Sequence, residues 1–156
     1  MIPDITIINR PQREIYGLWE KSNDKTIAKD IPALSRLFYD TVEQNTGSVL
    51  PFYVLSKNYD KTSGTFDLFI GSETTHHALE SFLLPEGIYG RVTVKPKLGF
   101  LWGFSVGKAK RYFYSEWLPS SQYTALNIEY EYHTEKSIAR KPQIDLFFAI
   151  KSSATK

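Results

Sequence analysis

The most restrictive feature of this sequence is an internal repeat. Three stretches of the first half recur in the second: IYG at 15–17 and 88–90, RLFYDT at 36–41 and RYFYSE at 111–116, and FDLFIGS at 66–72 and IDLFFAIKS at 144–152. They recur in the same order and at nearly the same separation, as a duplicated unit requires. We therefore predict a single domain over residues 1–156, with repeat one at about 3–75 and repeat two at about 80–151.

The first repeat reads as strand, helix, strand, strand. The stretch REIYGLWE alternates like a strand. A helix follows, with Asp30 as its predicted cap and Pro32 in its first turn. The stretches LPFYVLSK and TFDLFIGS then read as two strands joined by the turn-rich YDKTSG. The segment SETTHHALE is predicted to link this repeat to the next.

The second repeat reads the same way. GIYGRVTVK is its first strand, and a helix follows whose apolar stripe runs from Leu98 through Leu101 and Trp102 to Trp117. YTALNIEYEYH and PQIDLFFAIK are its last strands. A single repeat would leave strand edges unpaired, and pairing two repeats buries them. The pattern predicts an α+β fold: two β-α-β-β repeats related by a pseudo-two-fold axis, with an antiparallel sheet, two main helices on one face and a ligand cleft.

The junction WLPSSQY between the second helix and the next strand has its own predicted roles. Pro119 stops the helix because it lacks the backbone donor for the next turn. Ser120 and Ser121 can satisfy the free carbonyls of the helix end, and Tyr123 begins the strand. Trp117 either closes the core under the helix or forms a wall of the cleft.

Alternation sorts the strand residues into two faces, and the aliphatic-rich face should carry the helices. The other face is predicted to combine large aromatic side chains with carboxylates: Tyr53, Phe69, Tyr89, Phe147, Glu129, Glu131 and Asp145. A core face would not tolerate three carboxylates, and a solvated face would not need four aromatics. A ligand cleft accounts for both the aromatic side chains and the carboxylates. The alternative is an ordinary solvent-exposed face that carries scattered aromatic residues.

The charge pattern of this predicted cleft favours a cationic ligand. By repeat symmetry, Tyr53 in the first half and Glu129 in the second occupy roughly equivalent places. An aromatic ring opposite a carboxylate suits a flat cation, because ring faces attract cations. Trp19 and Trp102 complete the set of candidate ligand-binding aromatics.

The chain resembles the GyrI-like small-molecule-binding family, the effector-binding domain also found in multidrug-responsive and AraC-type regulators. IYGLW resembles the opening strand of that family, LPEGIYGRVTV its "P-x-G-x-Y" strand, and SEWLPSSQY followed by IEYEY its helix end and acidic strand. The resemblance implies a stand-alone receptor or sequestering protein for cationic, amphipathic aromatic compounds. It also implies a late-strand glutamate as the cation partner. Glu129 matches best, but Glu131 shares its face and leaves the assignment open.

Two other functions fit the same residues. Some members of the superfamily hydrolyse strained cyclopropane-bearing compounds, and Glu129 would then be the general base, with Tyr53 or Tyr89 assisting. The third reading is a protein-binding inhibitor module, which would present an exposed apolar patch to a protein partner not yet known. Formation of a hydrolysis product separates the second reading from the first.

Composition excludes several other classes. The formal charge of +2 provides no broad basic field, so we expect no direct contact with nucleic acid. The chain has no cysteine, and the adjacent His76 and His77 have poor metal-binding geometry, so we expect no metal and no cofactor. No signal peptide or apolar run of membrane-spanning length is evident, which favours a cytoplasmic, soluble protein.

Overall fold

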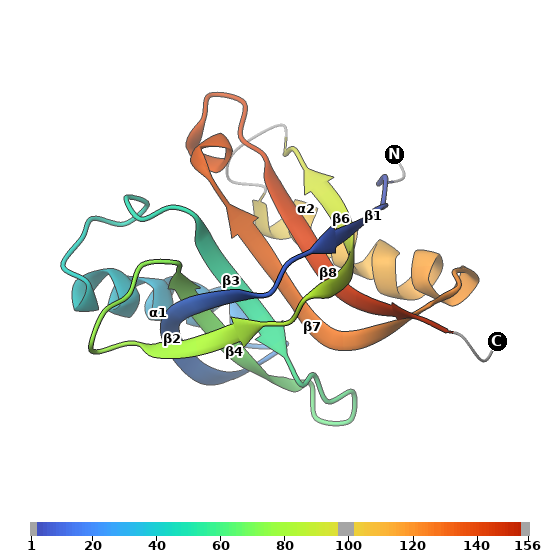
Figure 1. The fold of residues 1–156 in the computed structure, drawn as a ribbon, viewed down its shortest axis with the longest axis horizontal. Helices are drawn as coiled ribbons and strands as arrows, with labels where there is room; N and C mark the ends of the chain where they lie inside the picture. The colour runs from blue at the N-terminus through green and yellow to red at the C-terminus, as the bar shows by residue number, and fades with distance from the viewer. Residues whose placement is uncertain (1–2, 97–101, 154–156) are drawn as a thin grey trace.

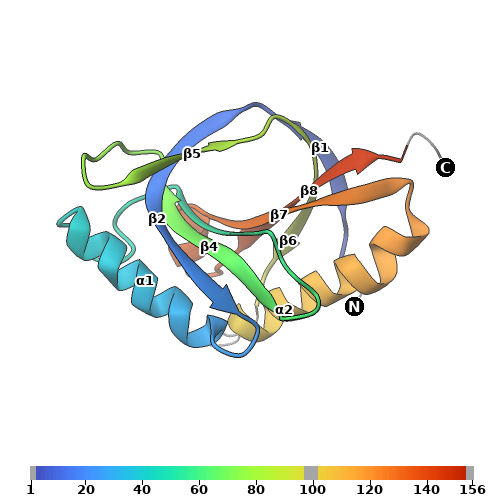
Figure 2. The ribbon, with the colours of Figure 1, turned by 90° about the horizontal axis from the view of Figure 1, so that it is seen from below.

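The structure is a computed structural model that describes residues 3–96 and 102–153. Eight strands form one antiparallel sheet in the order β1-β6-β8-β7-β3-β4-β2-β5, and two helices, α1 and α2, lie on one side of it (Figures 1 and 2). The elements are β1 (Thr6–Arg10), β2 (Arg13–Asn23), α1 (Ile27–Thr41), β3 (Phe52–Lys57), β4 (Thr65–Ser72), β5 (Glu80–Leu84), β6 (Gly87–Val94), α2 (Trp102–Tyr112), β7 (Tyr123–His133) and β8 (Ile144–Ser152).

The predicted fold of two β-α-β-β repeats is confirmed. β2, α1, β3 and β4 form the first unit, and β6, α2, β7 and β8 form the second. The strand order β6-β8-β7 in one half mirrors β2-β4-β3 in the other. β3 and β7 pair at the centre, where Tyr53 lies opposite Tyr132. The two halves therefore meet at a pseudo-two-fold axis through the middle of the sheet.

Two further strands, β1 and β5, were not predicted. β1 runs into β2 through Pro11 and Gln12, and β5 runs into β6 through Pro85 and Glu86. β1 pairs with β6, and β2 pairs with β5. The continuous segments β1–β2 and β5–β6 therefore run side by side from one half of the molecule to the other. The predicted linker SETTHHALE ends at Glu80, where β5 begins. Figure 2 shows how the sheet curls, with the helices outside the curl.

A glycine pair lets β2 and β4 approach closely where β2 also pairs with β5. Gly17 of β2 pairs with Gly71 of β4 and also with Glu80 of β5. A Cβ atom on Gly17 would lie 2.0 Å from the carbonyl oxygen of Ile70, and one on Gly71 would lie 2.2 Å from that of Tyr16. No side chain fits in this space, so only glycine permits the close approach of the two strands.

The pairing corrects the alignment of one repeated motif. The matched stretches of β4 and β8 place Gly71 opposite Ala149 in the repeat. Gly71 pairs with Gly17, whereas Ala149 pairs with Tyr89. The structural counterpart of Gly17 is therefore Tyr89 and not Gly90, so the two IYG stretches are one residue out of register.

The helices pack on the convex face of the sheet through equivalent phenylalanines. Phe38 of α1 and Phe113 beyond α2 are fully buried, as the match between RLFYDT and RYFYSE predicts. Phe113 stacks on Phe148 of β8, with ring centroids 4.0 Å apart. Helix α1 begins at Ile27, earlier than its predicted cap Asp30. Asp30 instead lies in the first turn and accepts hydrogen bonds from Ser22 and Thr26 hydroxyls.

The junction after α2 follows its predicted roles. The helix continues as a π-helical turn, Phe113–Trp117, and a 3-10 turn, Leu118–Ser120, before β7 begins at Tyr123. The Ser120 hydroxyl donates to the Glu116 carbonyl oxygen at 3.0 Å, and the Ser121 hydroxyl donates to that of Leu118 at 2.7 Å.

Trp117 belongs to the core under the helix. Its ring stacks between those of Phe113 and Tyr123, at centroid distances of 5.2 Å and 5.9 Å. Of the two roles predicted for Trp117, the structure therefore favours the core. Leu98 and Leu101, predicted on the same helical stripe, lie outside the described residues.

Candidate functional site

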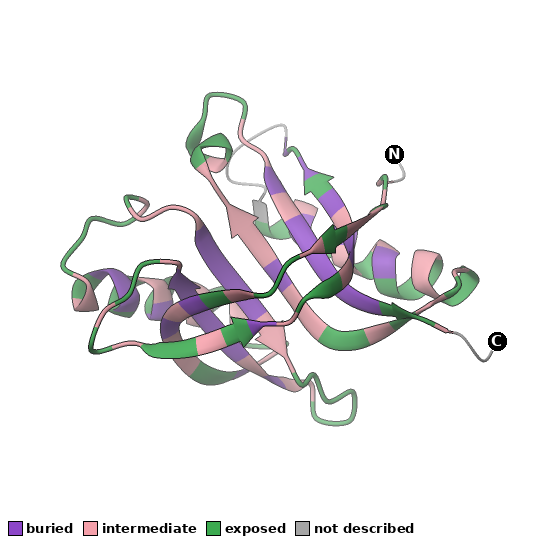
Figure 3. Ribbon diagram, viewed as in Figure 1, coloured by how far each residue is buried: buried purple, intermediate pink, exposed green. Residues whose placement is uncertain are grey.

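The curl of the sheet encloses a second apolar cluster on the face away from the helices, which we call the concave aromatic face. Its buried members are Ile15, Tyr53, Leu55, Phe69, Leu84, Tyr89, Tyr130, Phe147 and Ala149, and Trp19, Phe82 and Tyr132 are among its partly buried members. Figure 3 shows β3, β4 and β8 buried along much of their length. The prediction that Tyr53, Phe69, Tyr89 and Phe147 share one face is confirmed.

The interior of this face is filled by its own side chains. Tyr53 and Phe69 are 0 % exposed, and Tyr89 is 1 % exposed. The rings contact one another edge to face, as between Trp19 and Phe69 at 4.8 Å and between Tyr53 and Tyr132 at 5.3 Å. A ligand can therefore reach this face only at its ends, where Trp19, Phe82 and Tyr132 remain partly exposed.

The predicted placement of Glu129 and Glu131 on this face is wrong. Glu131 pairs with Val54 of β3 and Leu146 of β8, and both of these residues pack on the helix side. Paired residues share a face, so Glu129 and Glu131 point toward the helices. Tyr130 and Tyr132 take the concave positions instead. Neither Tyr53 nor Tyr89 can assist Glu129 across the sheet, as the hydrolase reading required.

Alternation alone could not have settled this point. Alternation shows which residues of one strand share a face. It does not show which of the two sets of residues lies on the same face of the sheet as a given set in the neighbouring strand. Here both faces of the sheet are apolar, because the curl buries the concave face as thoroughly as the helices bury the convex one. From the sequence alone, Tyr130 and Tyr132 of β7 therefore looked like residues that pack against a helix.

On the helix side, Glu129 and Glu131 belong to a cluster of charged groups beneath α2. The Lys110 Nζ atom lies 2.8 Å from Glu129 Oε2, and the Tyr114 hydroxyl donates to Glu129 Oε1 at 2.8 Å. The His133 Nε2 atom lies 3.0 Å from Glu131 Oε1. From the sequence, the basic run Lys108, Lys110 and Arg111 is predicted to lie on the solvent side of the helix, and for Lys110 that prediction is wrong. Burial, followed by the charge of Glu129, raises the pKa of the Tyr114 hydroxyl.

The carboxyl group of Glu131 should make stability depend on pH. Burial by itself raises the pKa of Glu131, but the His133 hydrogen bond and the Lys110 charge together lower it below its ordinary value. A lowered folded-state pKa stabilises the protein above the unfolded value of about 4.3, and this stability is lost as pH falls through the folded pKa. We expect the difference in unfolding free energy between wild type and Glu131→Gln to be largest near neutral pH and to shrink in acid.

Urea unfolding of both proteins between about pH 7 and pH 3 checks this expectation. Glu135→Gln, which changes an exposed carboxylate, is the matched control. A wild-type advantage over Glu131→Gln that stays constant across this pH range would contradict the assignment.

Asp145, predicted on the concave aromatic face, lies opposite Tyr132. A carboxylate that hydrogen bonds to a concave tyrosine is Glu73, which the sequence interpretation placed in a linker. The Tyr53 hydroxyl donates to Glu73 Oε2 at 2.7 Å, and Arg13 Nη1 lies 3.0 Å from Glu73 Oε1. Burial and this hydrogen bond raise the pKa of the Tyr53 hydroxyl. The signal for Glu73 was available, since it continues the alternation of Phe69 and Gly71 beyond the end of β4.

Cationic side chains lie against the rings at the ends of the concave aromatic face. The guanidinium carbon of Arg10 lies 4.4 Å from the ring centroid of Phe147. The Lys57 Nζ atom lies 4.9 Å from the ring centroid of Trp19 and 5.0 Å from that of Phe82. Trp19 therefore packs against this face, and its ligand-binding role stays a prediction. The side chain of Trp102 lies outside the described part of the chain.

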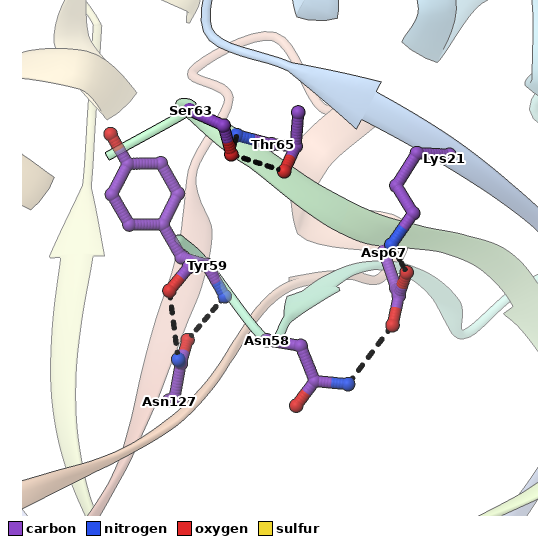
Figure 4. Close-up of polar contacts among 7 residues, drawn as sticks. All are labelled: Lys21, Asn58, Tyr59, Ser63, Thr65, Asp67 and Asn127. Atoms are coloured by element: carbon purple, nitrogen blue, oxygen red, sulfur yellow. Dashed lines mark hydrogen bonds and ion pairs between the residues drawn. The ribbon is translucent and has the colours of Figure 1, made fainter. Parts of the chain in front are cut away.

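Polar contacts at the Lys57 end hold the strands in register (Figure 4). Lys21 Nζ lies 2.6 Å from Asp67 Oδ1, and Asn58 donates to the other oxygen of Asp67 at 2.9 Å. Asn127, in a β-bulge of β7 with φ of 60°, exchanges hydrogen bonds between its side-chain amide and the backbone of Tyr59. The turn between β3 and β4 is thereby tied to β7.

Two surface depressions lie outside the concave aromatic face or at its border. One, of about 660 Å³, is lined by Tyr16, Thr75, His76, His77, Leu79 and Ser81. The other, of about 380 Å³, is bordered by Tyr89, Leu126, Ala149 and neighbouring residues. Among the described residues, no group of three potential ligands could hold a metal ion. No helix in the described ranges combines the length and apolar character needed to cross a membrane.

These features define an α+β domain of two fused repeats with an aromatic face enclosed by a curled sheet. Comparison with protein-family models and with curated proteins found no match. Among solved structures, a Vibrio cholerae integron cassette protein is 15% identical, with a TM-score of 0.69 over 94% of this chain and 95% of that one.

Two further solved structures have the same fold. A putative transcription regulation protein from Staphylococcus aureus is 11% identical, with a TM-score of 0.70 over 96% of this chain and 99% of that one. The protein SAV2435, solved with tetraphenylphosphonium bound, is also 11% identical, with a TM-score of 0.70 over 95% of this chain and 94% of that one. This chain therefore shares the fold of these three solved structures.

Proposed function

We propose that this protein binds small amphipathic aromatic compounds, above all cationic ones, on its concave aromatic face. One observation carries the proposal: the rings at the ends of this face already hold cations, namely the side chains of Arg10 and Lys57. Ring faces attract cations most strongly where water is excluded. A ligand with aromatic groups and a delocalised positive charge would make both kinds of contact.

The surroundings of the rings support this ligand class. A ligand entering at the partly exposed Trp19 and Phe82, or at Tyr132, would meet apolar surface on several strands, and burial of apolar surface favours binding. Glu73 contacts the Tyr53 hydroxyl of the same face and would provide the counter-charge by exchanging its partner Arg13 for the ligand cation. The structure of SAV2435, solved with tetraphenylphosphonium, supports a ligand of this chemistry in a domain of this fold.

A dye titration with two matched carboxylate variants tests the proposal. We expect a fluorescent cationic dye of the rhodamine type to bind wild type, and Glu73→Gln to weaken binding at least tenfold, about 1.4 kcal/mol. Glu129→Gln removes the same charge on the opposite face and is expected to change affinity less than twofold.

The three outcomes have different meanings. Loss of binding in Glu129→Gln but not in Glu73→Gln would restore the sequence-based assignment of the counter-charge to Glu129. Equal, small effects in both variants would leave the aromatic rings as the only contacts with the dye. Failure of wild type to bind any cationic aromatic dye would overturn the proposed function. Circular dichroism of each variant shows whether it is folded.

A further inference from the structure

The two cations on the concave aromatic face differ from the other basic side chains of that face. Arg13 and Lys21 each form an ion pair, with Glu73 at 3.0 Å and with Asp67 at 2.6 Å. Within residues 3–96 and 102–153, neither Arg10 nor Lys57 has a carboxylate within ion-pair distance. Both side chains are partly buried. The rings beneath them are therefore their main close partners.

Lys57 is the clearer case of the two. It is the last residue of β3, and its Nζ atom lies about equally far from two rings, 4.9 Å from Trp19 and 5.0 Å from Phe82. Asp67, directly across the strand pair from Lys57, is already engaged by Lys21 and Asn58. The position of the Lys57 ammonium group thus follows from the ring faces more than from a counter-ion.

A cationic ligand at this end would need the same ring faces. Two cations cannot occupy one ring face, and their charges repel each other. Lys57 is attached to the chain, so it is always present beside the rings at high effective concentration. Any cation that binds here must displace it, and the flexible stem of a lysine allows the ammonium group to move into water.

We infer that Lys57 is a built-in competitor that selects which cations the concave aromatic face admits, an inference that rests on the proposed function. Large aromatic cations with delocalised charge displace the ammonium group, because they also gain apolar contact with Trp19 and Phe82. Small, strongly hydrated cations do not gain that contact and are excluded. Lys57 is thus a specificity-determining residue.

Calorimetric titration with two probes tests this role. Tetraphenylphosphonium is the cationic probe, and triphenylphosphine oxide is a neutral aromatic probe of similar shape. We expect Lys57→Met to bind tetraphenylphosphonium roughly three- to tenfold more tightly than wild type. Binding of the neutral probe should change less than twofold, and Lys57→Arg should retain wild-type affinity for both probes.

Lys61→Met is the matched control, because Lys61 lies exposed in the turn between β3 and β4 and contacts neither a ring nor a carboxylate in the described part of the chain. It removes the same charge, so it reports any general electrostatic gain, and it leaves the Lys21–Asp67 pair intact. An equal gain in Lys61→Met and Lys57→Met would overturn the inference while leaving the proposed function intact. Weaker cation binding in Lys57→Met would also overturn it. If neither probe binds folded wild type or any variant, the proposed function fails, and the competitor role fails with it.

Discussion

Replacing Gly17 by alanine is expected to destabilise this protein by roughly 3 kcal/mol or more. The new Cβ atom would lie 2.0 Å from the Ile70 carbonyl oxygen and 2.7 Å from the Gly71 Cα atom. Both are backbone atoms of the paired strand, so relief of the clash requires β2 and β4 to separate. In thermal unfolding, the midpoint should fall by roughly 6–12 °C.

Gly107→Ala is the matched control for this substitution. Gly107 lies inside α2, and a Cβ atom there would meet nothing within 4 Å. Alanine favours a helix interior over glycine by about 1 kcal/mol, so this variant should be slightly more stable than wild type. A Gly17→Ala protein that melts at the wild-type temperature would show that the two strands do not approach as closely as described.

Replacing Lys110 by methionine is expected to cost about 2 kcal/mol of stability at neutral pH. Lys110 is the close cationic partner of Glu129, and its charge also lowers the pKa of Glu131. Without the Lys110 charge, the largely buried carboxylates of Glu129 and Glu131 would lie side by side on the same face of β7. Breaking a buried pair by removing one partner commonly costs about 3–5 kcal/mol. We expect less here because the Lys110 side chain is still 26% exposed.

Two variants separate the loss of this pair from other effects. Lys108→Met removes an exposed charge from the same helix and should change stability by less than about 0.5 kcal/mol. Lys110→Met combined with Glu129→Gln should recover part of the lost stability, because it leaves no unpaired charge at Glu129. Urea unfolding measures all of these changes. Equal stability of Lys110→Met and Lys108→Met would contradict the buried pair.

Much of the fold could be predicted because its determinants are local. The repeated FDLF and IDLF stretches and the matched Phe38 and Phe113 are recognisable within short windows of sequence. The serines after the second helix bond to carbonyl groups only three or four residues away. β1 and β5 could not be predicted in the same way. Each is a short strand whose stability depends on pairing with a segment far away in the sequence.

The candidate site was predicted only in part, and the error has a physical cause. Alternation within each strand correctly predicted that one face is shared by Tyr53, Phe69, Tyr89 and Phe147. The face of Glu129 depends on which β7 residue lies opposite Val54, and that pairing is a property of the sheet as a whole. Glu73 was missed because β4 continues its alternation past its last paired residue.

The sequence by itself thus determined the duplicated β-α-β-β architecture, the helix-packing phenylalanines and the membership of each alternating set. Local propensity and periodicity are encoded within short windows of chain, so they can be read without coordinates. Only the tertiary structure decided which alternating set of residues from each strand lies on the same face of the sheet as those of its neighbours. Strand register placed Glu129 and Glu131 beneath α2. Register together with the curl of the sheet brought Glu73, Arg10 and Lys57 to the aromatic rings.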